Sequence, residues 1–214
     1  LGPEGNLKTA RKGVGRFYIT VRGKAAHAGL DPGKGASAIL ELSHIIQKLF
    51  SLNDLDKGIT VNVGTIDGGL GANMVAPESK AEVDVRVPTR EDADRIEKTI
   101  YAIRAETPGT EVVIEGSVRR PPMERTPGNQ RLWRLAERSA AELGIEIDQA
   151  AAGGGSDGNT TSLFAPTLDG LGAVGAGAHA INEHLILDKM VERSALLARL
   201  LSHPPLDEAM PRVG

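Results

Sequence analysis

The sequence of 214 residues contains no cysteine. No disulfide can therefore form, and any metal site has to use histidine and carboxylate ligands, which suit zinc, manganese or cobalt. Aromatic residues make up only 3% of the chain, whereas hydrophobic residues in total make up 40%. The core is therefore expected to consist of Val, Ile, Leu and Ala.

Charge of one sign is not concentrated anywhere. The net charge is −3, and the Lys and Arg residues form no run or stripe. A nucleic-acid partner and an anionic membrane surface are therefore not expected, because both require clustered basic residues. No apolar run approaches the roughly 20 residues that span a bilayer, so no membrane segment is expected. The compartment stays unknown, with the cytoplasm favoured and the periplasm possible.

The first five residues have no initiator Met and neither the charged nor the apolar region of a signal peptide. They resemble a loop entered midway. We therefore expect the chain to be a fragment of a longer polypeptide.

The first 120 residues show strand and helix patterns in the order strand–helix–strand–strand–helix–strand. The strands are expected at 14–22, 59–67, 79–87 and 111–118, and the helices at 36–50 and 90–105. This order predicts a split βαβ unit, with two helices on one face of a four-stranded antiparallel sheet. The other face and an edge strand would remain available to another subunit. We place this domain at residues 11–121.

The second part begins after the Arg-Arg-Pro-Pro sequence at residues 119–122. Helices are expected at 129–143, around 161–163 and at 188–201, and strands at 146–151 and 168–174. A sheet of two strands is marginal alone, so residues 122–205 should need strands from elsewhere. Residues 1–10 are interpreted as the tail of a truncated catalytic domain, and 206–214 as a flexible tail.

The strongest local signal for chemistry is the loop Gly175–Glu183. His179 stands in a glycine- and alanine-rich segment, followed by a carboxylate at Glu183. A loop of this kind can present an imidazole to a metal, with a nearby acceptor orienting the ring. The alternative is a surface histidine in a flexible loop.

A second signal is the glycine-rich loop Gly153–Asn159. Glycines let the backbone approach a ligand closely, and a following helix start offers free N–H groups to an anion. The lysine of a phosphate-binding loop is absent. The alternative is a tight turn with a capping Ser or Asp.

Three polar side chains of the first domain could hold an oxyanion and a carboxylate. His27 follows a strand in a loop of small residues, Asn73 follows the glycines at 68–71, and Arg86 lies on the strand face opposite the apolar one. Each also has an ordinary structural interpretation, as a turn cap, a left-handed turn residue and a solvated cross-strand partner.

Five segments together resemble one family. GKAAHAG, NVGTIDGGLGANMVAP, DVRVP, GGGSDGN and GAGAHAINE occur in this order in the M20 zinc peptidases, and the resemblance is strongest to the carboxypeptidase G2-like (glutamate carboxypeptidase) members. It covers residues 7 to 201. The fold class that it implies is α/β, with a βαββαβ two-layer α+β lid, or dimerisation domain, inserted into an α/β zinc-exopeptidase catalytic domain.

For the lid, the resemblance implies that His27 reaches into the partner subunit's active site and stabilises the tetrahedral oxyanion. It implies that Asn73 and Arg86 grip the terminal carboxylate of the substrate, with Arg120 as a helper.

For the second part, the resemblance implies that Gly154, Gly155 and Ser156 line the substrate pocket and that His179 is a zinc ligand. The family's other metal ligands should precede this chain. Glu4 is not assigned as a ligand, because Pro3-Glu4 reverses the family's Glu-Pro order.

The whole protein is thus expected to be a homodimer that binds two zinc ions per active site, with cobalt or manganese possible. Its substrate would be a small peptide or an N-acyl amino acid, and the fragment itself should be inactive. Alternatives within the family are an aminoacylase, deacetylase, desuccinylase or tripeptidase. An alternative of another class is a non-catalytic dimerisation or ligand-binding module.

Overall fold

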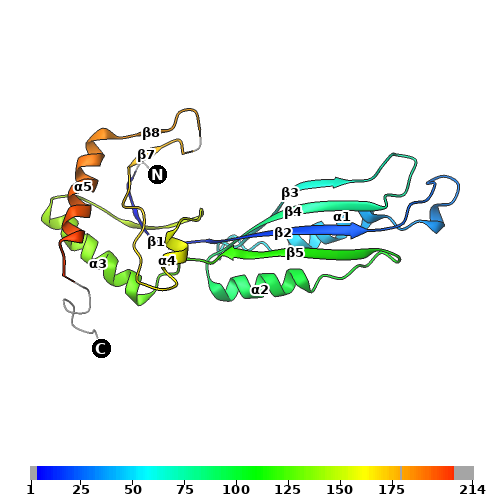
Figure 1. Ribbon diagram of the computed structural model, residues 1–214, viewed down its shortest axis with the longest axis horizontal. Helices are drawn as coiled ribbons and strands as arrows, with labels where there is room; N and C mark the ends of the chain where they lie inside the picture. Colours follow the sequence, from blue (N-terminus) through cyan, green and yellow to red (C-terminus); the bar gives the residue numbers. More distant parts are fainter. Residues whose placement is uncertain (1–3, 179, 205–214) are drawn as a thin grey trace. The chain divides into compact units, whose positions relative to one another are not determined.

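The computed structural model describes residues 4–178 and 180–204, and the chain forms two compact units (Figure 1). The sheet unit comprises Lys12–Pro122 together with Gly153–Gly155. The second unit comprises the described residues of three segments, 4–11, 123–152 and 156–204 without 179.

The sheet unit has four antiparallel strands in the spatial order β3-β4-β2-β5. The strands are β2 (Gly13–Arg22), β3 (Thr60–Gly68), β4 (Glu78–Val87) and β5 (Glu111–Arg120). The helices are η1 (Pro32–Lys34, one 3₁₀ turn), α1 (Ala38–Phe50) and α2 (Arg90–Tyr101). The predicted strand–helix order and the antiparallel sheet are confirmed.

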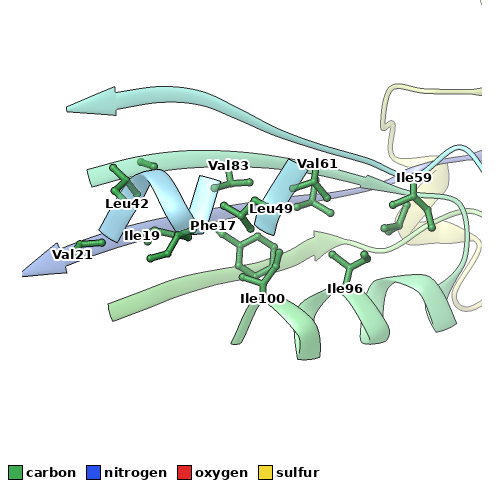
Figure 2. Close-up of a cluster of buried hydrophobic side chains, with 14 of the residues drawn as sticks. Phe17, Ile19, Val21, Leu42, Leu49, Ile59, Val61, Val83, Ile96 and Ile100 are labelled. Carbon is green, nitrogen blue, oxygen red and sulfur yellow. The ribbon is translucent and has the colours of Figure 1, made fainter. Parts of the chain in front are cut away.

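The core of the sheet unit lies between the sheet and the two long helices. Alternate residues of β2, Phe17, Ile19 and Val21, are buried. Leu42, Ile45 and Leu49 of α1 and Ile96 and Ile100 of α2 pack against the same cluster (Figure 2). The cluster is aliphatic apart from Phe17, as the scarcity of aromatic residues predicts.

Side chains cap both long helices of this unit. Ser37 accepts a hydrogen bond from the Leu40 amide, and Thr89 accepts one from the Asp92 amide, so each satisfies a free N–H group of a first turn. The helix predicted at 90–105 ends four residues earlier, at Tyr101. Pro108 disfavours helical backbone at the residue before it, and the amides of Glu106 and Thr107 bind the Glu41 side chain instead.

The second unit contains three helices and short strands among its described residues. These are β1 (Leu7–Arg11), α3 (Pro127–Glu142), β6 (Gln149–Ala152), α4 (Gly158–Thr161), β7 (Gly175–Ala176), β8 (His184–Leu185) and α5 (Leu187–Leu201). β1 pairs with β6 in parallel, and β7 pairs with β8 in antiparallel.

Residues 7–11, in the segment interpreted as the tail of a truncated catalytic domain, form strand β1. Two strand predictions for the second unit were wrong. The strand predicted at 146–151 begins at Gln149. No strand spans 168–174, where the described backbone makes one isolated bridge between Asp169 and Lys8. Gly170 has a φ of +79°, a left-handed conformation that interrupts an extended strand.

The core of the second unit is small. Its buried side chains are Leu7, Trp133, Ala136, Ala140 and Leu196. Several large apolar side chains of α5 are instead exposed, Leu187 and Val191 among them. No described helix has the length and apolar character that a membrane crossing requires.

Candidate active-site residues

The His27 loop and the segment around Asn73 lie side by side in the sheet unit. The Ala28 amide donates to the Asn73 carbonyl oxygen at 2.9 Å, and the Val75 amide donates to the Ala26 carbonyl oxygen at 2.9 Å. An isolated bridge pairs His27 with Met74. The structure thus brings two motifs together that the sequence places 46 positions apart, from 27 to 73. The side chains of His27 and Asn73 are both exposed.

The ring of His27 is oriented by its own loop. Its Nδ1 atom accepts hydrogen bonds from the Gly29 amide at 3.1 Å and the Leu30 amide at 3.2 Å. A neutral imidazole has one donor and one acceptor nitrogen, so this network assigns the proton to Nε2. The loop therefore presents an N–H donor to solvent.

Arg86 projects from the face of β4 opposite the core, as predicted, but its guanidinium is already paired. Its Nε atom donates to Asp84 Oδ1 at 2.7 Å and its Nη2 atom to Asp84 Oδ2 at 3.0 Å. Each side chain is 31% exposed. A substrate carboxylate that binds Arg86 would have to share the guanidinium with Asp84.

Arg120 stands at the end of β5 against the glycine-rich loop. A Cβ atom on Gly155 would lie 2.6 Å from Arg120 Cδ and 3.4 Å from Val14 Cγ2, whereas one on Gly154 would have no neighbour within 4 Å. Glycine at 155 therefore permits the close approach of the loop to Arg120. At 154 the space around the residue is open.

Ser156 uses its hydroxyl within the second unit. The hydroxyl donates to Asp169 Oδ2 and accepts from the Gly158 amide. The Ser156 amide donates to Asn159 Oδ1 at 2.8 Å. The helix that follows, α4, has only four residues. An anion site at this helix start is therefore not supported, and the turn is held by the side chains of Asn159 and Asp169.

Among residues 4–178 and 180–204, no group of three or more His, Asp or Glu side chains could hold a metal ion. His179, the predicted zinc ligand, lies outside the described residues. Glu4 accepts a hydrogen bond from the Asn6 side chain. The described residues thus do not fit a metal centre by themselves.

Asp169 and Arg11 also interact near the glycine-rich loop, although no motif identified in the sequence included them. The Arg11 Nε atom donates to Asp169 Oδ2 at 2.6 Å, and burial raises the pKa of Asp169 while the hydrogen bonds from Ser156 and Arg11 bring it below its usual value. The available signal was an acidic residue before a glycine, Asp169-Gly170, between two glycine-rich loops.

Comparison with known proteins identifies one domain of the chain. Residues 9–111 match the M20 peptidase dimerisation domain. Over 203 residues the chain is 26% identical to carboxypeptidase G2 of Pseudomonas sp. (strain RS-16), with 91% of this chain and 48% of the relative covered. Over 213 residues it is 29% identical to acetylornithine deacetylase of Myxococcus xanthus, with 91% of this chain and 53% of the relative covered. Residues 9–111 thus form a peptidase dimerisation domain of the M20 type.

Solved peptidase structures share its fold. The aminopeptidase PepT of Bacillus cereus superposes with a TM-score of 0.77 at 23% identity, over 93% of this chain and 54% of that one. A dinuclear metal-binding M20 peptidase of Bacillus subtilis superposes with a TM-score of 0.65 at 17% identity, over 92% of this chain and 53% of that one. The chain spans about half the length of these curated relatives.

Proposed function

We propose that this chain is part of a metal-dependent hydrolase that cleaves the amide bond of a small peptide or an N-acyl amino acid. The relatives carry the names carboxypeptidase and acetylornithine deacetylase, and a solved structure of the same fold is an aminopeptidase. Hydrolysis of an amide bond is common to these activities. A carboxypeptidase acting on a glutamate-like C-terminal residue is the specific form that we favour.

The observation that carries this proposal is the fixed tautomer of His27. Two backbone amides donate to Nδ1, so Nε2 carries a hydrogen that an oxyanion can accept. A donor held in place before the reaction stabilises the negative charge that develops on the carbonyl oxygen. His27 is exposed, so this donor is accessible to a site outside its own unit.

We further propose that the protein is a homodimer that pairs along β3 and α1. β3 is an edge strand, and an unpaired edge is a template for another strand. A groove of about 370 Å³ runs beside it, with Ile39, Leu42, Ile46 and Ile66 in its lining. Ile66 is 67% exposed, so the edge offers both backbone groups and apolar surface to a second copy. In such a dimer His27 would serve the partner's active site.

For the substrate, we propose that Asn73, Arg86 and Arg120 bind a free carboxylate and that Gly154, Gly155 and Ser156 line the pocket. Asn73 supplies an exposed amide, and Arg86 supplies a planar fork suited to a carboxylate. Asp84 accepts from Nε and Nη2 of Arg86, so the substrate carboxylate would compete with Asp84 for the guanidinium.

For the metal, we propose two zinc ions, or cobalt or manganese, with His179 as one ligand. A catalytic zinc normally has about three protein ligands, so the others would come from the half of the relatives that this chain does not match. When bound, the metal would supply an activated water and polarise the scissile carbonyl.

The test is a substrate panel of dipeptides and N-acyl amino acids, assayed with zinc, manganese and cobalt on a form of the protein that spans its relatives. His27→Ala should lower kcat on the order of a hundredfold, the usual effect of losing one oxyanion donor. His44→Gln, on α1 in the same unit, is the matched control and should leave kcat near that of the wild type. Near-normal turnover by His27→Ala would refute the oxyanion role. A dimer that hydrolyses no substrate of the panel would favour the non-catalytic module.

A further inference from the structure

Three hydrogen bonds converge on the carboxylate of Asp169. Oδ2 accepts from Arg11 Nε at 2.6 Å and from the Ser156 hydroxyl, and Oδ1 accepts from the Gly170 amide. The side chains of Arg11 and Asp169 are 15% and 23% exposed. Charge-assisted hydrogen bonds in a partly desolvated place are stronger than neutral ones in water. This carboxylate is therefore the centre of a small polar cluster.

Backbone hydrogen bonds hold Asp169 in place. The Asp169 amide donates to the Lys8 carbonyl oxygen at 3.0 Å, and the Lys8 amide donates to the Asp169 carbonyl oxygen at 2.7 Å. Lys8 is part of β1. The carboxylate is thus presented from a residue whose backbone N–H and C=O groups are both hydrogen-bonded to Lys8 of β1.

The hydroxyl group of Ser156 both donates and accepts a hydrogen bond here. Its single hydroxyl proton goes to Asp169, and its oxygen already accepts from the Gly158 amide. Because a serine hydroxyl has only one proton, Ser156 has no donor left for a ligand while this contact lasts. These two hydrogen bonds instead hold the C-terminal end of the glycine-rich loop in place.

The cluster also includes residues at the points in the sequence where the chain crosses from one unit to the other. Arg11 is the last residue before the sheet unit, and Met123 and Ser156 are each the first residue after a segment of it. Arg11 and Met123 exchange backbone hydrogen bonds at 2.9 and 3.0 Å, and Asp169 joins Arg11 to Ser156. One carboxylate therefore links segments that enter and leave the sheet unit.

We propose that Asp169 is a positioning residue that fixes the end of the glycine-rich loop, residues 156–158, by holding Ser156 and ties it to the end of β1 through Arg11. The inference rests on the proposed function in one respect, that this loop lines the substrate pocket. Asp169 itself touches no substrate and acts through Ser156. Its lowered pKa keeps the carboxylate ionised at neutral pH, so both oxygens remain acceptors.

The test compares Asp169→Asn with Asp157→Asn, a matched change at an exposed carboxylate of the same loop. Amide hydrogen exchange at residues 156–159 should become faster by about tenfold or more in Asp169→Asn, and the NMR signal of the Arg11 Nε–H group should shift or broaden. Asp157→Asn should change neither. Exchange and an Arg11 signal equal to those of the wild type in Asp169→Asn would overturn the proposal.

A second pair of variants covers the case in which Asp169→Asn does not fold. Ser156→Ala removes only the hydroxyl and should speed exchange at residues 157–159 while the Arg11 signal persists. Ser156→Thr retains a hydroxyl and should restore protection. Equal exchange in the Ala and Thr variants would refute the role of the hydroxyl.

These measurements need no hydrolysis, so they separate a failure of this proposal from a failure of the proposed function. In a form that hydrolyses substrate, Asp169→Asn should raise KM by about tenfold with a smaller change in kcat, because the loop binds substrate and does not touch the reacting atoms. A loosened loop with an unchanged KM would refute the positioning role in substrate binding.

Discussion

The carboxylate of Glu41 accepts a hydrogen bond from the Thr107 amide at 2.6 Å, although the two residues lie 66 positions apart. Glu41 is completely buried in α1, and it also accepts from the Glu106 amide at 3.0 Å. A buried charge is tolerated only where such partners are present. This single side chain therefore ties α1 to the turn after α2.

Replacing Glu41 should destabilise the sheet unit. Glu41→Ala leaves two backbone N–H groups without their acceptor, and each such loss costs about 1–3 kcal/mol. Urea unfolding should show a free energy of unfolding lower by about 2–6 kcal/mol. Glu82→Ala, at an exposed position of β4, should change it by less than about 0.5 kcal/mol. Equal effects of the two substitutions would contradict the role of Glu41.

Glu41 should also make folding stability depend on acid pH. Burial raises the pKa of Glu41, but the hydrogen bonds from Thr107 and Glu106 outweigh it and leave the pKa below the usual value. A group whose pKa is lower in the folded state contributes stability above its unfolded pKa of about 4.3, and the contribution is lost as the pH falls through the folded value. Urea midpoints measured from pH 6 down to pH 3 should therefore fall less steeply in Glu41→Gln than in the wild type. Parallel profiles would count against this assignment.

The proposed dimer can be tested on the groove beside β3. Ile66→Arg places a charge among the apolar side chains of Ile39 and Ile46, and burying an unpaired charge at an interface is unfavourable. Light scattering should show a shift from dimer to monomer. Leu55→Arg, at a position that is 75% exposed and outside the groove, should remain dimeric. A dimer that tolerates Ile66→Arg would exclude this surface as the interface.

The role of Arg86 predicts a selective loss of substrate binding. In an active form, Arg86→Ala should raise KM by about tenfold or more for substrates with a free carboxylate, because a bidentate charged pair is lost. Carboxamide analogues of the same substrates should be affected much less. Asp84→Asn removes the internal competitor for the guanidinium and should not reproduce this loss for carboxylates. Equal losses on both substrate types with Arg86→Ala would contradict carboxylate recognition.

The sequence by itself determined the architecture of the sheet unit. Three of its features are local patterns that involve only residues close together in the chain. They are the alternating apolar residues in β2 and β4, the helical spacing of Leu42, Ile45 and Leu49, and the cap at Thr89. These local patterns correctly predicted the order of strands and helices and the aliphatic core. The second unit was predicted less well, because its short strands carry little pattern and β1 is defined by pairing with β6, about 140 residues away.

Only the tertiary structure decided which hydrogen-bond partners the candidate site residues have. The segment around Asn73 lies against the His27 loop, and Asp169 binds both Arg11 and Ser156. The pairing of Arg86 with Asp84 and the tautomer of His27 are also properties of side-chain geometry. Motifs in a sequence show which chemical groups are available. Their partners are set by hydrogen bonds that form when segments distant in the chain fold against one another, and those bonds leave no periodic trace in the sequence.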